Sequence, residues 1–485
     1  MRDPKAPERS PATLDPEDRA ELRRQAHRML DDALDFLEGV PEGPVWRPMP
    51  PEIRASFDAP LPSGPSPLAN VHEEFARSVL PHGTGNVHPR FFGWVHGGGN
   101  PAGMLGEMLA ATLNSNLGGR DHAGVEVERQ VVRWMRQVFG LPATASGIVV
   151  TGSSMANFMG VSVAKTSKLG TATRTAGLDV SNTKLVAYTS VRAHSCVARA
   201  MELSGLGSDA LRLVPVDADH RMDIAALRTM MAHDRVEGRT PFLIVGTAGT
   251  VDVGAFDDIA TLADIAEQER LWLHVDGAFG SLCALSPDLK HLVRGLDRAD
   301  SIACDFHKWM QVPYDAGLLM VRDEQAHRAA FANEPAYLAR ATRGLAAGSP
   351  WFTDFGPELS RGFRALKVWF TMKVYGLDAL GNVIAETCRV ARDLRDRVLA
   401  EPELELMAPV ASNIVCFRYR TNDSDRVNDE IVIALQESGL AVPSTTRIDG
   451  KLAIRAAIVN HRTRTSDVNL LIDGVLDHGR RLRNG

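Results

Sequence analysis

Short apolar runs alternate with amphipathic stretches through the middle of the chain, and this alternation predicts an α/β fold. The runs are rich in β-branched residues and cover residues 147–150, 184–188, 242–245, 271–275 and 301–304. Stretches with helical spacing, such as 223–232 and 258–268, separate them. Strands that alternate with helices pair in parallel, so we expect a mainly parallel sheet covered by helices on both faces. Residues 317–321 follow too closely for a crossover helix and should run antiparallel.

The first 90 residues have a different pattern, which predicts a helical and proline-rich arm. One amphipathic helix is expected to begin after Asp15, its N-cap, and to end at Gly39. Its apolar stripe must lie on another domain or another subunit. Nine of the 27 prolines lie within residues 41–67, so we expect a surface strap there rather than a flexible linker. The expected anchors of this strap are Trp46, Ile53 and Phe57.

The last third of the chain predicts a smaller α+β domain. A long helical pattern begins after about residue 361, and apolar runs at 411–417 and 452–458 precede a last helix from about residue 466. We therefore divide the chain into an arm (1–90), a large α/β domain (91–370) and a small C-terminal α+β domain (371–485).

Composition excludes several classes of function. The 485 residues include 54 Lys plus Arg and 60 Asp plus Glu, so a net charge of −6 gives no reason to expect nucleic acid or an anionic membrane as partner. The five cysteines are scattered without a Cys-x-x-Cys pair, which argues against a disulfide scaffold or a structural zinc site. No apolar run approaches the roughly 20 residues that span a bilayer. We expect a cytoplasmic enzyme with no metal site.

Small and hydroxyl residues follow the first predicted strand. The chain reads Thr151-Gly152-Ser153-Ser154 and then continues as a helix. The unpaired N–H groups at the start of a helix favour an anion, and two hydroxyls add donors, so Ser153 and Ser154 are candidates for holding a phosphate. The alternative is a capped turn without a ligand.

Three further polar residues stand at predicted strand ends. Asp276 follows a strand apolar enough to be central and needs a partner, for which a cationic ring nitrogen would serve; a metal or a loop cap is the alternative. Lys308 is flanked by Phe306 and Trp309, so desolvation would lower the pKa of its amine, and a neutral amine forms a Schiff base with an aldehyde; a solvated surface charge is the alternative. His194 can stack on an aromatic ring or serve as a structural histidine. Together these residues provide the contacts that pyridoxal phosphate requires.

With these residues the sequence resembles the group II pyridoxal-phosphate-dependent amino acid decarboxylases of fold type I. This family includes aromatic-L-amino-acid, glutamate and histidine decarboxylases. The likeness extends from His88 to the last predicted helix. The motifs that carry it are His307-Lys308-Trp309, His274-Val275-Asp276-Gly277-Ala278, Ala193-His194-Ser195, and Gly246-Thr247-Ala248-Gly249-Thr250 with Gly254-Ala255-Phe256-Asp257.

The resemblance implies a seven-stranded sheet, a homodimer with shared active sites, and a role for each matching residue. Lys308 would bond to the cofactor, Asp276 would keep the pyridine nitrogen protonated, and His194 would stack on the ring. The other implied cofactor contacts are Ser153, Ser154, Thr250, Ala278 and His307. Tyr337, in the segment 334–338, would belong to a mobile loop and return a proton after carbon dioxide leaves. The arm would interlock two subunits.

The substrate is an L-amino acid, and we expect an aromatic one. Phe91, Phe92, Trp94 and His96 could line an aromatic pocket or belong to the core. Arg120 lies in a stretch that is small and polar here, where aromatic-specific relatives have bulky residues; it would meet the distal carboxylate of an acidic substrate or pair with Asp121 on the surface. The alternatives are therefore a glutamate- or aspartate-type decarboxylase, an aldehyde synthase on the same scaffold, or a cofactor-binding protein without turnover.

Overall fold

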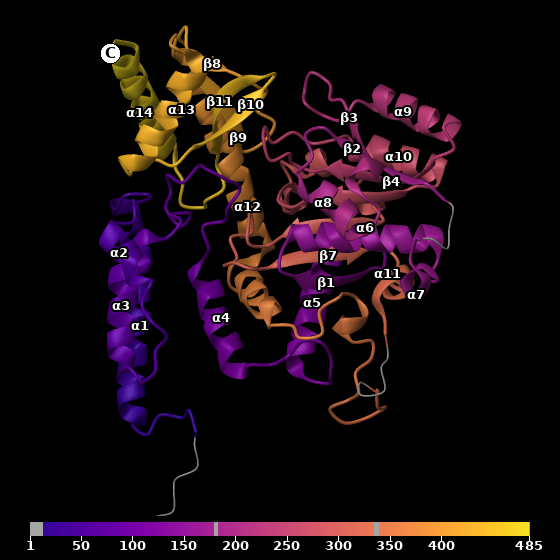
Figure 1. Cartoon of the computed structure of the whole chain (residues 1–485), viewed down its shortest axis with the longest axis horizontal. Helices are drawn as coiled ribbons and strands as arrows, with labels where there is room; N and C mark the ends of the chain where they lie inside the picture. Colours follow the sequence, from indigo (N-terminus) through magenta and orange to yellow (C-terminus); the bar gives the residue numbers. More distant parts are fainter. Residues whose placement is uncertain (1–12, 179–182, 334–338, 485) are drawn as a thin grey trace, which may run out of the picture.

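A computed structural model describes residues 13–178, 183–333 and 339–484. Figure 1 shows a column of arm helices, a central α/β body, and a smaller sheet with helices near the C-terminus. The chain passes through these parts in the order that the sequence pattern predicts.

The body is built on a seven-stranded sheet with the order β1-β7-β6-β5-β4-β2-β3. Its strands are β1 (Ser146–Val150), β2 (Leu185–Ser190), β3 (Leu211–Val214), β4 (Thr240–Thr247), β5 (Trp272–Asp276), β6 (Ser301–Asp305) and β7 (Gly317–Val321). Only β7 pairs antiparallel, with β1 and β6, while the other neighbours are parallel. The predicted α/β fold and the antiparallel strand at 317–321 are confirmed. The short edge strand β3 has no predicted counterpart.

Helices cover both faces of this sheet because successive strand residues point to opposite sides. Ile148 and Val150 pack with helix α6, whereas Val149 between them belongs to the core under helix α5. The helices of the body are α4 (Pro101–Leu113), α5 (Ala123–Val138), α6 (Ser153–Leu169), α7 (Thr173–Ala176), α8 (Cys196–Leu203), α9 (Ile224–Val236), α10 (Ile259–Glu269) and α11 (Glu324–Phe331). The predictions at 223–232 and 258–268 correspond to α9 and α10.

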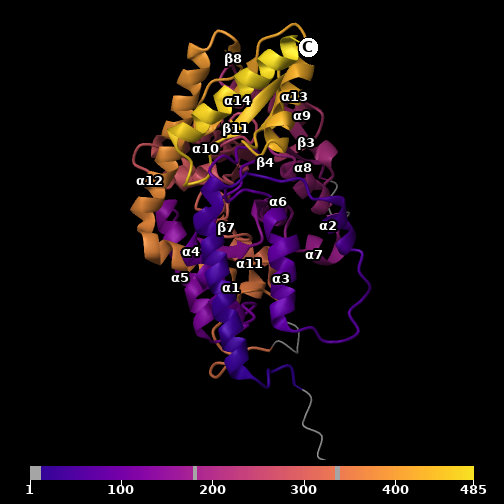
Figure 2. The same ribbon diagram turned by 90° about the vertical axis from the view of Figure 1, so that its left-hand side faces the viewer.

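The arm contains α1 (Arg19–Gly39), α2 (Pro51–Ser56) and α3 (Leu68–Ser78), which Figure 2 shows in front of the body. The first helix begins later than predicted, because Asp18 rather than Asp15 caps it by accepting the N–H groups of Ala20 and Glu21. The predicted strap includes the short helix α2, since prolines are tolerated at a helix start.

The anchoring of the strap agrees with the prediction only in part, because the predicted anchor Trp46 packs against the buried cluster that contains Val45. Phe57 is 57% exposed, whereas Val45 is buried against Phe91 and Val442. On α1 the apolar side chains Leu22 and Met29 remain exposed, so the stripe of this helix is only partly covered within one chain.

The last part of the chain forms a four-stranded antiparallel sheet with the order β10-β11-β9-β8. Its strands are β8 (Leu404–Leu406), β9 (Ile414–Tyr419), β10 (Ser444–Ile448) and β11 (Lys451–Ala457), and its helices are α13 (Ser424–Glu437) and α14 (Thr465–Asn484). The segment α12 (Arg364–Ala400), which is kinked at Gly376, joins it to the body, so the predicted boundary at residue 370 falls inside a helix. No helix in the described part of the chain is long and apolar enough to cross a membrane.

Candidate active site

A cavity of about 320 Å³ lies at the carboxyl ends of the central strands. The neighbouring parallel strands β4, β5 and β6 end at Thr247, Asp276 and Asp305, and all three side chains line the cavity. Lys308 follows β6 directly, and the first residue of α6, Ser153, closes another side. Open parallel sheets bind their ligands at this edge.

The amine of Lys308 forms an ion pair with Asp305. Its Nζ lies 2.8 Å from Oδ2 of Asp305, and the two side chains are 22% and 2% exposed. Burial lowers the pKa of Lys308, but the negative charges of Asp305 and Asp276 outweigh this effect, so the pKa is raised above its usual value. The lowered pKa expected from the sequence is therefore wrong, because the fold places carboxylates beside the amine.

Asp305 is central to the cavity, although the sequence analysis gave it no role. It accepts hydrogen bonds from the backbone N–H of Ser153 at 2.6 Å and from the Ser153 hydroxyl at 2.7 Å. Both donors of Ser153 therefore point to a carboxylate, and Ser154 is the exposed hydroxyl that faces the cavity beside it. An acid at the end of a buried strand is the signal that singled out Asp276, and it applies equally to Asp305.

Asp276 and His194 lie in the same cavity but in different surroundings. Asp276 is buried; its Oδ1 accepts the N–H of Ala278 at 3.2 Å, and its Oδ2 lies 3.8 Å from Sγ of Cys196. Burial raises the pKa of Asp276, and the positive charge of Lys308 opposes this rise. His194 is exposed, and its Nδ1 accepts the N–H of Cys196 at 3.1 Å, which leaves Nε2 as the protonated nitrogen of the neutral ring.

His307 and Thr247 complete the polar lining. Nδ1 of His307 accepts the N–H of Ala316 at 3.0 Å, its ring lies 4.2 Å from that of Tyr314, and burial lowers its pKa. The buried Oγ1 of Thr247 has no hydrogen-bond partner among the residues that the structure describes. A Cβ atom on Gly152 would lie 3.3 Å from the His307 ring, so the glycine leaves space between that ring and the start of α6.

The family model of the pyridoxal-dependent decarboxylase conserved domain matches residues 50–420. The chain belongs to this family.

Relatives of this decarboxylase cover nearly its whole length. An aromatic-L-amino-acid decarboxylase of Bacillus atrophaeus is 30% identical, with 92% of this chain and 93% of that protein covered. A phenylacetaldehyde synthase of Arabidopsis thaliana is 28% identical over 92% of this chain and 93% of its own. The solved glutamate decarboxylase domain of a diaminobutyrate-pyruvate transaminase and L-2,4-diaminobutyrate decarboxylase from Vibrio parahaemolyticus is 28% identical, with a TM-score of 0.86 over 97% of both chains.

The decarboxylase uses pyridoxal 5′-phosphate, and its cavity fits this cofactor. Lys308 offers an amine for the aldehyde, and Asp276 offers a buried carboxylate for the ring nitrogen. The hydroxyl of Thr247, which has no partner among the described residues, offers a donor to polar groups of the cofactor, and Gly152 leaves room for them. The enzyme is a pyridoxal-phosphate-dependent amino acid decarboxylase, as the sequence resemblance implied.

The structure brings most of the predicted site residues together. Those that line the cavity are Ser153, Ser154, His194, Asp276, Ala278, His307 and Lys308. Thr250 does not line it, because its hydroxyl accepts the N–H of Ala255 within a turn, and Thr247 takes this place. Tyr337 lies outside the described residues.

Of the predicted substrate residues, Trp94 and His96 line the cavity, whereas the other three lie elsewhere in this chain. Phe92 belongs to the core of the small sheet, and Phe91 is buried behind the cavity with its ring 5.9 Å from that of His96, which does line the cavity. Arg120 lies 4.3 Å from the ring centre of Trp351, in a separate cavity of about 260 Å³. In this chain Arg120 stacks on Trp351, and its contact with the distal carboxylate of an acidic substrate stays a prediction.

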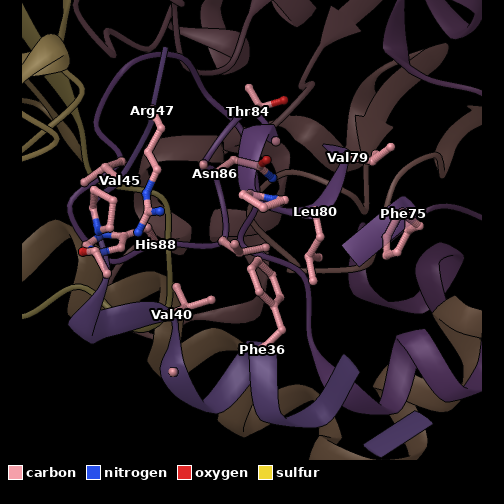
Figure 3. A pocket seen from close by; sticks show the side chains of 17 residues that line it. Phe36, Val40, Val45, Arg47, Phe75, Val79, Leu80, Thr84, Asn86 and His88 are labelled. Carbon is pink, nitrogen blue, oxygen red and sulfur yellow. The ribbon is translucent and has the colours of Figure 1, made fainter. Parts of the chain in front are cut away.

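A larger hollow of about 570 Å³ lies in the arm, lined by residues between 36 and 88 (Figure 3). Phe36, Val40 and Phe75 give it an apolar wall, and Arg47 and His88 add polar groups. It contains neither Lys308 nor the carboxylates of the strand ends, so the larger hollow is not the site of the chemistry.

Asp305→Asn is expected to lower the pKa of the Lys308 amine, because it removes the carboxylate nearest to Nζ. The apoprotein would be treated with an amine reagent over a range of pH, and modification of Lys308 would be followed by peptide mass spectrometry. The midpoint should move to lower pH than in the wild type. Asp300→Asn, at the opposite end of β6, is the control and should leave the midpoint in place. An unchanged midpoint in Asp305→Asn would contradict the ion pair.

Proposed function

We propose that this enzyme converts an aromatic L-amino acid to its amine and carbon dioxide. The observation that carries the proposal is the cavity in which Lys308 and Asp276 meet, with Trp94 and Phe279 in its wall. The name of the Bacillus atrophaeus relative supports the aromatic substrate. His96 adds an uncharged ring to the wall, because burial and the nearby cations Lys308 and Arg455 lower its pKa.

In this proposal the residues of the cavity hold the cofactor from several sides. Lys308 would bond to its aldehyde, and Asp276 would pair with its ring nitrogen. His194 and Ala278 would contact the two faces of the ring. The contacts proposed for the phosphate are the hydroxyls of Ser154 and Thr247 and the ring of His307, with Ser153 holding Asp305 in place.

The same residues prepare the site for loss of a carboxylate. When bound, pyridoxal phosphate supplies an electron sink for the electron pair that the departing carbon dioxide leaves behind. Asp276, buried and negatively charged opposite a cation, would keep that sink positive. The ion pair of Lys308 and Asp305 would hold a proton at Nζ when the amine is not bonded to a ligand. Val95 and Phe279 would exclude water from the scissile bond.

Tyr337 stays a prediction of the sequence resemblance as the residue that returns a proton to the substrate carbon. The role of Tyr337 also matters for the alternative product, an aldehyde, which the name of one relative, a phenylacetaldehyde synthase, brings into question here. The presence of this tyrosine favours the amine as product.

We also propose that the enzyme acts in the cytoplasm as a homodimer with shared active sites. The division into the arm (1–90), the large domain (91–370) and the small domain (371–485) is part of this proposal. The partly exposed stripe of α1 and the apolar hollow beside it support a second copy as the cover. In such a dimer Arg120 and its neighbours would reach the partner's cavity, where the guanidinium would meet a distal carboxylate, and this keeps an acidic substrate as the second candidate.

A screen for carbon dioxide release tests the proposed function. The loaded enzyme would be offered L-tryptophan, L-tyrosine, L-phenylalanine, L-glutamate, L-aspartate and L-2,4-diaminobutyrate, and amine, aldehyde and ammonia would be measured. We expect release from an aromatic substrate with one amine per carbon dioxide. Release from an acidic substrate that Arg120→Ala abolishes would replace the aromatic assignment, and so would release from L-2,4-diaminobutyrate. Aldehyde with ammonia would replace the reaction type.

A further inference from the structure

A row of buried polar side chains runs behind Asp276, and none of them except Asp276 has a role in the proposed function. The row begins at Trp272, at the start of β5, and returns to the end of the same strand at Asp276. Its members, in order, are Trp272, Ser301, His274, Asn157, Cys196 and Asp276.

The first half of this row has only one direction of donation. The indole N–H of Trp272 can only donate, and it donates to Oγ of Ser301 at 2.8 Å. The Ser301 hydroxyl also lies 2.7 Å from Nδ1 of His274, and it donates there because Nε2 of the ring faces Oδ1 of Asn157, which can only accept. Burial lowers the pKa of His274 to about 3, so the ring is neutral and carries its single proton on Nε2.

The second half continues in the same direction. Nε2 of His274 donates to Oδ1 of Asn157 at 2.7 Å, which leaves the amide nitrogen of Asn157 to donate to Sγ of Cys196 at 3.1 Å. The thiol proton is then directed to Oδ2 of Asp276 at 3.8 Å. Burial and the charge of Asp276 raise the pKa of Cys196 to about 12, so the thiol keeps this proton.

We propose that Cys196, oriented by Asn157 and His274, is a positioning residue that fixes the carboxylate of Asp276 toward the cofactor. The N–H of Ala278 holds Oδ1 and the thiol holds Oδ2, so the carboxylate cannot rotate freely and its remaining lone pairs face the cavity. A thiol is a weak donor, so it sets the orientation while withdrawing little negative charge from the carboxylate. This inference rests on the proposed pairing of Asp276 with the ring nitrogen.

The experiment combines cofactor binding with a spectroscopic measurement on the protein itself. Cys196→Ala removes the donor, Cys196→Ser keeps one, and Cys388→Ala is the matched control, since Cys388 is another buried cysteine, in α12. We expect Cys196→Ala to weaken the binding of pyridoxal phosphate about tenfold and to lower kcat without a matching rise in KM. Cys196→Ser should return the dissociation constant to within about threefold of the wild type, and Cys388→Ala should not change it.

The infrared S–H stretching band gives a reading that does not depend on activity. The band of Cys196 in the wild-type apoprotein is isolated by subtracting the spectrum of Cys196→Ala, or of Cys196→Ser if the alanine variant does not fold. This band should lie at the lower frequency of a hydrogen-bonded thiol. A band at the frequency of a free thiol would overturn the proposal. So would cofactor binding by Cys196→Ala that equals the wild type.

Failure of this inference is distinguishable from failure of the proposed function. If Asp276→Asn abolishes turnover while Cys196→Ala binds and reacts as the wild type does, only the role of Cys196 is wrong. If Asp276→Asn itself leaves turnover unchanged, the pairing with the ring nitrogen is wrong, and the positioning role falls with it.

Discussion

Lys308→Ala is expected to abolish the visible absorbance of the loaded enzyme and to lower kcat by roughly 10³-fold or more. The visible band depends on a covalent link between the cofactor aldehyde and Nζ, and Lys308 is the lysine that lines the cavity. Its removal also leaves Asp305 buried without its ion-pair partner. Absorption spectra of the dialysed protein and a carbon dioxide assay would measure both effects.

A half-buried lysine outside the cavity serves as the control. Lys165 on α6 is half-buried and donates to the carbonyl oxygen of Ser204, but it does not line the cavity. Lys165→Ala should keep both the absorbance and the turnover. Reduction of the wild-type enzyme with borohydride should place the cofactor adduct on Lys308. Full turnover and yellow colour in Lys308→Ala would remove the cofactor assignment of this cavity.

Asp276→Asn is expected to lower kcat by about 10²- to 10³-fold while the cofactor stays bound. The amide has nearly the same shape as the carboxylate but carries no negative charge, so it cannot stabilise a cationic ring nitrogen. Because Lys308 is unchanged, the covalent link should form and the visible band should persist with an altered position. Steady-state kinetics and absorption spectra would separate the two effects.

The control for this substitution is a buried aspartate remote from the cavity. Asp234 is 2% exposed, compared with 3% for Asp276, and it pairs with Arg212 on the edge strand β3. Asp234→Asn should lower the stability of the fold more than kcat. If Asp276→Asn retained wild-type kcat, the ring nitrogen would need no charged partner in this enzyme.

Much of the sheet was predictable because its signals are local. Each parallel strand from β4 to β6 is a run of β-branched and apolar residues, and such runs can be recognised in the sequence without knowledge of the neighbouring strands. The antiparallel direction of β7 followed from a connection too short for a crossover. The edge strands β3 and β8 are short and partly exposed, so they lack this signal.

The residues of the site also differ in whether a local signal in the sequence identifies them. Lys308, Asp276 and His194 were identified because each follows a predicted strand within a motif, and strand ends converge on one edge of a parallel sheet. Phe91 and Phe92 could not be placed from sequence, because an aromatic side chain suits a pocket wall and a core equally well. Only the packing of the small sheet decided that Phe92 is core.

By itself the sequence determined the fold class, the family and the position of the cofactor lysine along the chain, because these depend on local patterns and on motifs. The tertiary structure alone decided that Ser153 bonds to Asp305, 152 positions away, and that Cys196 lies beside Asp276, 80 positions away. It thereby reversed the predicted shift of the Lys308 pKa. Charges and hydrogen bonds act over a few ångströms, so their effects are set only when folding brings distant strand ends and helix starts together.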